Sequence, residues 1–416
     1  ATPQGEIQPL LERCLQTGCR VRRITDLQEV EAGGTGGQVR DIDISDLLGM
    51  RKEHLSMGDA PTYFAGKTVL ITGGGGSIGA ELCRRLLTLS PEKIVLYDLS
   101  ENYMYDLFDE LEEERHESLK GKLILCVGSI RDEKRLGEVM RRYAPQVVLH
   151  AAAHKHVPLM EDCPGQAIKN NVFGTYTAAR CAVDAGVSRF VMISTDKAVN
   201  PTNIMGASKR LAELVVEAMN GLNKTEFVAV RFGNVLGSHG SVVPKFERQI
   251  RAGGPITLTH PEIIRYFMTI PEAAALVLQA AALARGGELF VLDMGRPVKI
   301  RELAERMIQL SQAQGAPPVE IVYTGLRPGE KLYEELLTSS EGLGRTERDQ
   351  IFVAKPERPT MDAMRQMLDT LQACLDENGD MRACMHQLLP EFREPEEVNR
   401  EAEARRTAEA AQAAGA

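Results

Sequence analysis

The chain has 416 residues, of which 43% are hydrophobic and 26% are charged, and its formal net charge is −9. This composition is ordinary for a globular protein, and the length suits two or three domains. The negative balance argues against non-specific binding of nucleic acids, and 5% aromatic content without Trp argues against a stacking platform for bases.

The sequence also argues against a disulfide-rich protein, a metal site and a membrane-spanning segment. The eight cysteines form no C-x-x-C pair, which favours reduced thiols over a disulfide framework. His154 and His156 are one residue apart and have no third ligand nearby, so no metal site is expected. The sequence contains no signal peptide and no apolar run of membrane-spanning length. It also begins without Met, and we expect a piece of a longer protein.

Residues 1–60 predict the end of an α/β unit followed by a linker. "IQPLLERCLQTG" has helical periodicity and a Gly stop, and "CRVRRI" is typical of a short strand. "EAGGTGG" predicts a loop before a further strand in "VRDIDI".

A regular alternation of strands and helices begins at Lys67. Six short β-branched runs, "KTVLIT", "KIVLYD", "KLILCV", "QVVLHA", "RFVMIS" and "FVAVRF", are separated by helical stretches. This alternation predicts an α/β fold, a Rossmann-type doubly wound parallel sheet with a smaller C-terminal substrate-binding domain. The predicted segments are 61–236 (dinucleotide-binding domain), 237–355 (mainly the smaller domain, with some segments returning to the sheet), 356–394 (C-terminal helices) and 395–416 (a solvated helical or disordered tail).

The stretch "VLITGGGGSIGAEL" follows a predicted strand and opens a helix. Gly73, Gly76 and Gly79 give a spacing that permits a tight turn and close approach to a pyrophosphate, with Ser77 and Ile78 at the helix start. Asp98 ends the next strand, where its carboxylate suits two ribose hydroxyls and repels a 2′-phosphate, so NAD is favoured over NADP.

The next two strands end in further candidate cofactor residues. Ser129 and Ile130 follow the third strand and are expected beside the adenine. The small side chains after the fourth strand would let the backbone pass close to the cofactor, or would serve tight packing alone; they are Ala151, Ala152 and Ala153.

Six motifs occur in the order of one enzyme family: "TGGGGSIG", "HAAAHKHVPLME", "STDKAVNPTNIMGASKR", "RFGNVLGSHGSVVPKF", "THPEIIRYFMTIPEA" and "GLRPGEKLYEELL". With them, residues 65 to about 340 resemble the extended short-chain dehydrogenase/reductase family. More narrowly, they resemble the membrane-anchored nucleoside-diphosphate-sugar 4,6-dehydratases of bacterial polysaccharide and protein-glycosylation pathways. In that branch a methionine replaces the usual catalytic tyrosine, as Met205 does here.

The resemblance implies a nucleotide-sugar site. Arg265 and Arg327 would clamp the diphosphate, and Glu330 would hold the ribose hydroxyls of the nucleotide. Asn234 would contact phosphate or sugar, and Lys155 matches a lysine that related enzymes direct at the substrate.

The resemblance also implies UDP-N-acetylglucosamine as substrate, with a tightly bound NAD that is regenerated in each turnover. Lys209 would hold the nicotinamide ribose, and Met205 would fill space. We expect Thr195 to bond the 4-hydroxyl, Asp196 to protonate the departing 6-hydroxyl and Lys197 to remove the carbon-5 proton. The base for the 4-hydroxyl is the least defined role; Asp196, directly or through water, is a candidate.

Three alternatives stay open: a dehydratase that inverts carbon 5, a UDP-sugar epimerase, and a non-catalytic scaffold that binds NAD and a nucleotide sugar. Retention at carbon 5 is favoured, because inverting branches usually keep the tyrosine. The resemblance further implies that residues 1–60 are the remnant of a preceding Rossmann-like domain and that a missing N-terminal segment provides the membrane anchor. We therefore expect a soluble fragment from the cytoplasmic part of a bacterial inner-membrane protein, without nucleic-acid partners, and expect a homo-oligomer.

Overall fold

The computed structural model divides into two compact units. It describes residues 10, 11, 13, 14, 17, 21–24, 39–50, 57–119, 121–222, 224–338, 341–354 and 358–414. The larger unit comprises Leu55–Gly233, Ile270–Gly295 and Arg327–Ala416, and the smaller unit comprises Ala1–His54, Asn234–Thr269 and Arg296–Leu326.

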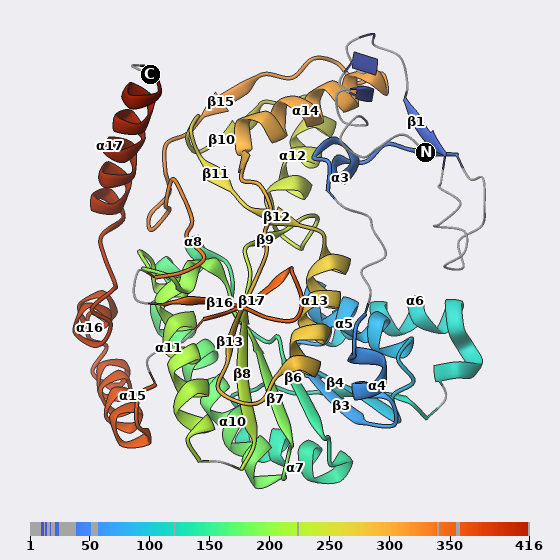
Figure 1. Cartoon of the computed structure of the whole chain (residues 1–416), viewed down its shortest axis with the longest axis vertical. Coiled ribbons are helices and arrows are strands. Elements are labelled where there is room, and N and C mark those ends of the chain that lie inside the picture. Colours follow the sequence, from blue (N-terminus) through green and yellow to red (C-terminus); the bar gives the residue numbers. More distant parts are fainter. Residues whose placement is uncertain are drawn as a thin grey trace. The chain divides into compact units, whose positions relative to one another are not determined.

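A nine-stranded sheet, counted over the described residues, forms the centre of the larger unit (Figure 1). Its parallel strands are β3 (Thr68–Thr72), β4 (Lys93–Asp98), β5 (Leu123–Val127), β6 (Val147–His150), β7 (Arg189–Ile193), β8 (Glu226–Arg231) and β13 (Leu289–Leu292). The order β5-β4-β3-β6-β7-β8 is the Rossmann order, so the predicted fold class is confirmed. Strand order reverses between β3 and β6, and ligands bind doubly wound sheets at this point.

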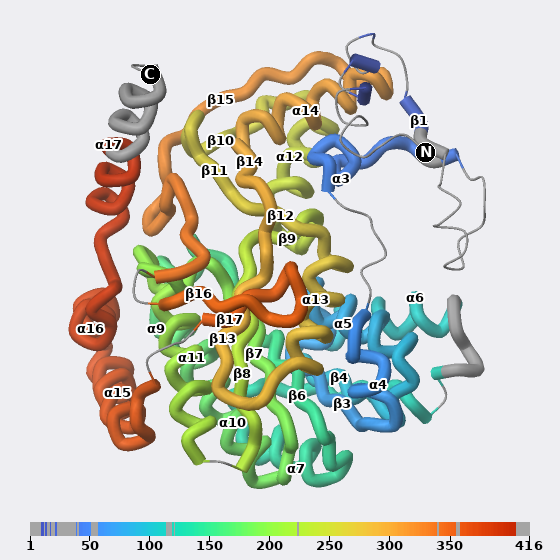
Figure 2. The backbone as a smooth tube through the Cα atoms, in the orientation of Figure 1, coloured from blue at the N-terminus to red at the C-terminus, as the bar shows by residue number. Residues whose placement is uncertain are grey.

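The segment after residue 327 returns to this sheet. β17 (Ile351–Ala354) pairs antiparallel with β13, and β16 (Leu343–Arg345) pairs antiparallel with β17. Figure 2 shows both strands beside β13. The antiparallel edge therefore extends the parallel Rossmann sheet.

Helices cover both faces of the sheet because its strands are apolar on both sides. On one side, α5 (Ser77–Leu87) packs against α13 (Ile270–Leu283), which also contacts α4 (Ala60–Phe64). On the other side, α10 (Gly174–Asp184) packs between α7 (Glu133–Tyr143) and α11 (Ile204–Asn220) (Figure 1). The remaining elements of this part are α6 (Glu101–Leu119), α8 (Val157–Asp162), α9 (Pro164–Ala167), the π-helix η1 (Ile168–Phe173) and the 3-10 helix η2 (Asp196–Ala198).

The C-terminal segment forms helices that pack on the larger unit. They are α15 (Met361–Asp376), α16 (Met381–Leu388) and α17 (Pro395–Ala414), and the first two contact α11. The Arg393 amide donates to the Pro201 carbonyl at 3.0 Å, and the Asn399 side chain accepts from the Leu332 amide at 2.8 Å. The start of α17 is thus bound to two loops of the same unit.

The smaller unit is built from two-stranded pairs and helices around its own core. The pairs are β9 (Asn234–Val235) with β12 (Phe267–Met268), β10 (Ile256–Leu258) with β15 (Ile321–Tyr323), β11 (Ile264–Arg265) with β14 (Val298–Lys299), and β1 (Arg22–Ile24) with β2 (Val39–Asp41). The helices are α3 (Ile44–Leu47), α12 (Val242–Arg251) and α14 (Ile300–Ala313). Phe246 of α12 and Leu303 of α14 are buried together with Ile256 and Leu258.

The domain boundaries stay predictions. Residues 270–295 and 327–354 cluster with the larger unit. The predicted remnant at residues 1–60 lies largely outside the described residues.

Candidate active site

The glycine-rich turn between β3 and α5 has the geometry of a dinucleotide loop. Gly73 has φ +68°, and a Cβ there would lie 2.6 Å from the Ala152 amide nitrogen. Only glycine suits this position, because both the backbone angle and the space exclude a side chain. The helix begins at Ser77 directly after Gly76, so its first amides face the turn.

The predicted ribose acid belongs to the same loop. Asp98 accepts the Gly75 amide at 3.0 Å and the Ser100 amide at 2.8 Å, one on each carboxylate oxygen. Each oxygen keeps a second lone pair, so the carboxylate is oriented and still able to accept ribose hydroxyls. The close approach at Gly73 and the oriented Asp98 carboxylate therefore suit a bound dinucleotide.

The other predicted cofactor residues lie at the ends of neighbouring strands. The Ala151 amide donates to the Thr72 carbonyl at 3.0 Å, which brings the end of β6 beside the glycine turn. Ser129 is partly exposed and its carbonyl accepts from the Tyr97 hydroxyl at 2.9 Å. Ile130 is 4% exposed and part of the hydrophobic core. Its contact with adenine stays a prediction.

Thr195, Asp196 and Lys197 come together at the carboxyl end of β7. The Asp196 side chain is fully buried, and its Oδ1 accepts from Thr195 Oγ1 at 2.8 Å and from Lys197 Nζ at 2.9 Å. The other oxygen, Oδ2, is buried and accepts no hydrogen bond from the described residues. The Lys197 side chain is 18% exposed, so its ammonium lies at the edge of the buried group.

Helix α11 brings Met205 and Lys209 beside this group. Both are buried, and Lys209 Nζ donates to the Ile193 carbonyl at 2.7 Å, at the end of β7. Burial lowers the pKa of Lys209 to about 8, and Glu213 acts in the opposite direction. Gly206 allows the close approach, since a Cβ there would lie 2.2 Å from the Lys197 carbonyl oxygen.

Three buried residues at this site were missed in the sequence. The Asn171 side chain bridges the His154 backbone at the end of β6 and the Ser208 hydroxyl of α11, with bonds of 2.8 to 2.9 Å. It lies in the π-helix η1, an element often found at functional sites. Lys331 donates to the Val199 carbonyl at 2.9 Å.

The third missed residue is Glu334, whose Oε1 lies 4.0 Å from Lys197 Nζ. Lys331 and Glu334 both belong to "GLRPGEKLYEELL". From the sequence, only Arg327 and Glu330 of this motif are predicted as substrate residues.

The predicted substrate residues fall in both units. In the smaller unit, Asn234 Nδ2 donates to the Tyr266 carbonyl at 3.2 Å, and the buried Arg265 donates to its neighbour's carbonyl. In the larger unit, Arg327 Nη2 lies 3.0 Å from Glu330 Oε1. Lys155 is exposed after β6. Their roles toward substrate stay predictions.

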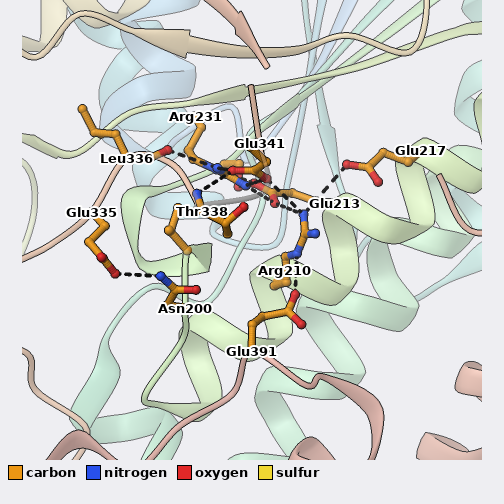
Figure 3. A network of polar contacts seen from close by, with 12 residues as sticks. Asn200, Arg210, Glu213, Glu217, Arg231, Glu335, Leu336, Thr338, Glu341 and Glu391 are labelled. Carbon is orange, nitrogen blue, oxygen red and sulfur yellow. Dashed lines mark hydrogen bonds and ion pairs between the residues drawn. The ribbon is translucent and has the colours of Figure 1, made fainter. Parts of the chain in front are cut away.

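A buried network of charged side chains links α11 to β8 (Figure 3). Arg231 of β8 is fully buried and bonds Glu213 of α11 at 2.8 and 3.1 Å and Glu341 at 2.8 and 3.2 Å. Ser194 donates to Glu213 at 2.5 Å and is the residue before Thr195. The network thus ties the end of β7 to α11 and β8.

Two histidines lie near this site, and burial lowers the pKa of both. His150 is fully buried between the hydroxyls of Thr72 and Thr175, and burial lowers its pKa to about 3, so it is neutral. Burial, with a smaller effect of Arg131, lowers the pKa of His154. Within the described ranges, no three His, Cys, Asp or Glu side chains are grouped in a way that suits a metal ion.

The sequence matches the model of the polysaccharide biosynthesis protein family over residues 69–356. The chain belongs to this family. Its resemblance to the extended short-chain dehydrogenases/reductases is thereby confirmed. Among the residues that the structure describes, no helix has the length and apolar character needed to cross a membrane.

Relatives of the chain include a probable polysaccharide biosynthesis protein, a nucleotide-sugar dehydratase and a nucleotide-sugar epimerase. EpsC, a probable polysaccharide biosynthesis protein of Bacillus subtilis strain 168, is 48% identical over 340 residues, which are 81% of this chain and 56% of EpsC. The chain thus spans about half the length of that relative. A UDP-N-acetylglucosamine 4,6-dehydratase (inverting) of Campylobacter jejuni is 33% identical, covering 72% of this chain and 86% of its own. A UDP-glucose 4-epimerase of Rickettsia canadensis is 35% identical, covering 68% and 81%.

Solved structures share the fold. DesIV, a dTDP-glucose 4,6-dehydratase from Streptomyces venezuelae crystallised with NAD and TYD bound, has a TM-score of 0.57 and 25% identity over 65% of this chain and 88% of that chain. A doubly wound Rossmann sheet is therefore common to this chain and that enzyme.

Proposed function

We propose that the chain is a UDP-N-acetylglucosamine 4,6-dehydratase that makes a UDP-2-acetamido-2,6-dideoxy-4-keto-hexose. The observation that carries the proposal is the buried, hydrogen-bonded pair of Asp196 and Lys197 beside the Thr195 hydroxyl. Elimination of water needs an acid and a base held close together, and a 4-epimerase does not. The dehydratase among the relatives supports the same class.

We propose NAD as the cofactor, held by the glycine turn at Gly73 and by Asp98, with Lys209 on the nicotinamide ribose. When bound, NAD would supply the acceptor for a hydride from carbon 4 of the sugar and the donor of a hydride to carbon 6. The solved relative with NAD supports this assignment. Met205 is a spacer in this scheme, because a thioether has no proton to transfer.

The proton transfers fall to three side chains. Thr195 bonds the 4-hydroxyl, and Asp196 takes the 4-hydroxyl proton and later gives it to the departing 6-hydroxyl as water leaves. Lys197, as the neutral amine, removes the carbon-5 proton and afterwards returns a proton to carbon 5. Return from the same side of the sugar retains the configuration at carbon 5.

The substrate residues are assigned by resemblance. Arg265 and Arg327 neutralise the diphosphate, Glu330 bonds the nucleotide ribose, and Asn234 and Lys155 contact phosphate or sugar. Membrane anchoring, a cytoplasmic location and a homo-oligomeric state stay predictions of the same resemblance.

A UDP-sugar 4-epimerase is the second candidate, favoured by relatives of that name. An epimerase would return the hydride to carbon 4, whereas the dehydratase loses water. The buried acid–base pair favours the dehydratase. A scaffold without turnover is the third outcome.

The test is incubation of the protein with UDP-N-acetylglucosamine in D₂O, with products read by mass spectrometry and NMR. The expected product has lost one water, carries deuterium at carbon 5 and forms without net NADH. Asp196→Asn and Lys197→Met should each reduce turnover by about 100-fold or more with NAD still bound. Full turnover by Asp196→Asn would show that the assignment is wrong. Inverted carbon 5 would identify the inverting alternative.

A further inference from the structure

A second carboxylate lies beside the proposed acid–base pair. Lys197 Nζ is 2.9 Å from Asp196 Oδ1 and 4.0 Å from Glu334 Oε1. The Glu334 side chain is 4% exposed and the Asp196 side chain is fully buried. The ammonium therefore has two buried carboxylates as neighbours, and these belong to segments far apart in the sequence.

The segment that carries Glu334 is hydrogen-bonded to the loop that follows β7 and η2. Lys331 Nζ donates to the Val199 carbonyl at 2.9 Å, directly after η2. Thr202 Oγ1 and Asn203 Nδ2 both donate to the Gly329 carbonyl, at 3.0 and 3.1 Å. These bonds hold the segment that carries Glu334 beside η2.

Both acidic and basic side chains lie near Lys197. Asp196 and Glu334 are its acidic neighbours. Burial lowers the pKa of the nearby Lys331, and both carboxylates act in the opposite direction. Lys331 is 2% exposed, and Glu335, at 45% side-chain exposure, lies 3.7 Å from its Nζ. When Lys197 takes up the carbon-5 proton, Glu334 is a second carboxylate, beside Asp196, that stabilises the ammonium.

We propose that Glu334 is a positioning residue for the elimination: its carboxylate holds Lys197 at the end of β7 and sets the pH range in which Lys197 is a base. The role rests on the proposed dehydratase function for its catalytic meaning. The electrostatic contact itself does not, since it exists without substrate. A carboxylate within 4 to 6 Å raises the pKa of an ammonium, and its removal lowers that pKa by about one unit or more.

The first test measures Lys197 directly. Protein labelled with ¹³Cε-lysine is titrated by NMR, and the Lys197 resonance is assigned by its loss in Lys197→Arg. In Glu334→Gln we expect the midpoint of Lys197 to fall by about one pH unit. The matched control is Glu335→Gln, the next residue along, which bonds Asn200 and pairs with Lys331 but does not contact Lys197 directly. Its midpoint should equal that of the wild type.

The second test is the pH profile of kcat with UDP-N-acetylglucosamine. Because Lys197 acts as the neutral amine, the acid limb should move to lower pH in Glu334→Gln by the same amount as the titration. The plateau of kcat should fall by about tenfold with KM nearly unchanged, since the base is less well placed. A purely structural role would lower activity at every pH and leave the limb in place.

The outcomes separate the two proposals. Wild-type protein without dehydration activity would overturn the proposed function, and the NMR titration would still decide the role of Glu334. Coincident titrations of wild type and Glu334→Gln, or an equal shift in Glu335→Gln, would overturn the positioning role. If Glu334→Gln does not fold, Glu334→Asp serves instead: its shorter side chain should shift the Lys197 midpoint in the same direction by less, and no shift would again overturn the role.

Discussion

Replacement of Glu213 by Gln tests the buried network in depth. One Glu213 oxygen accepts Arg231 Nη2 at 2.8 Å and Arg210 Nη1 at 3.1 Å, and the other accepts Arg231 Nε at 3.1 Å and Ser194 Oγ at 2.5 Å. The side chains of Glu213 and Arg231 are both fully buried. In Glu213→Gln the new NH₂ group faces donors wherever it points, and Arg231 loses half of its charge compensation.

The magnitude follows from burial. Loss of one partner of a buried ion pair costs about 3 to 5 kcal/mol, and the lower end applies because Glu341 still pairs with Arg231. A loss of about 3 kcal/mol should lower Tm by about 5 °C in a unit of this size. Thermal scans at one fixed rate and urea midpoints measure it. The pKa of Glu213 is lowered to about 2, because its arginine partners outweigh burial, so this stability is present above pH 4.5 and lost as pH falls toward 2.

The matched control is Glu110→Gln. Glu110 makes a bidentate pair with Arg84 at 2.7 and 2.8 Å, but the two side chains are 45% and 33% exposed. Water screens this pair, so its loss should cost less than about 1 kcal/mol. Equal losses in Glu213→Gln and Glu110→Gln would refute the reasoning.

Three further predictions concern other parts of the larger unit. Burial raises the pKa of Glu217 from 4.5 to about 8, so its contribution to stability is fully present below pH 4.5 and is lost as pH rises toward 8. Between pH 5 and pH 8, wild type should therefore lose on the order of 3 to 4 kcal/mol relative to Glu217→Gln, measured by urea denaturation at both pH values. Gly73→Ala should weaken NAD binding by more than about tenfold in calorimetry, since its Cβ would lie 2.6 Å from a backbone nitrogen. Asp98→Asn should weaken NAD binding and reduce the preference for NAD over NADP by about tenfold in the same assay.

Each of these predictions has its own contrary result. Parallel pH profiles of stability for wild type and Glu217→Gln would show that Glu217 titrates normally. Unchanged affinity in Gly73→Ala, in a variant with the wild-type Tm, would show that NAD binds elsewhere. An unchanged preference for NAD in Asp98→Asn would mean that another group excludes the 2′-phosphate.

The sequence predicts the Rossmann sheet and the glycine turn well because both are local patterns. The six apolar runs correspond to β3 to β8, and the glycine spacing follows β3 directly. Asp98 was found for the same reason, since it ends the next strand. Asp196 and Lys197 were found because they are adjacent at the end of β7. Their proposed roles as acid and base come from the resemblance to the 4,6-dehydratases.

The missed residues depend on long-range packing. Lys331 reaches the Val199 carbonyl and Glu334 reaches Lys197 across more than 130 residues, and no local pattern encodes such contacts. Glu213 and Glu217 resemble exposed positions of an amphipathic helix. They are buried because α11 is covered on every side, including by α15 and α16. Asn171 has a local signal in the sequence, the polar pair Asn170 and Asn171 inside an apolar helical stretch.

The most direct test of the central claim follows the hydride. UDP-N-acetylglucosamine deuterated at carbon 4 is incubated with the protein and stoichiometric NAD in H₂O, and the product is examined by NMR. We predict a 4-keto-6-deoxy sugar with the deuterium on carbon 6. Deuterium that stays on carbon 4 of an epimerised sugar, or bound substrate that is recovered unchanged, would contradict the dehydratase.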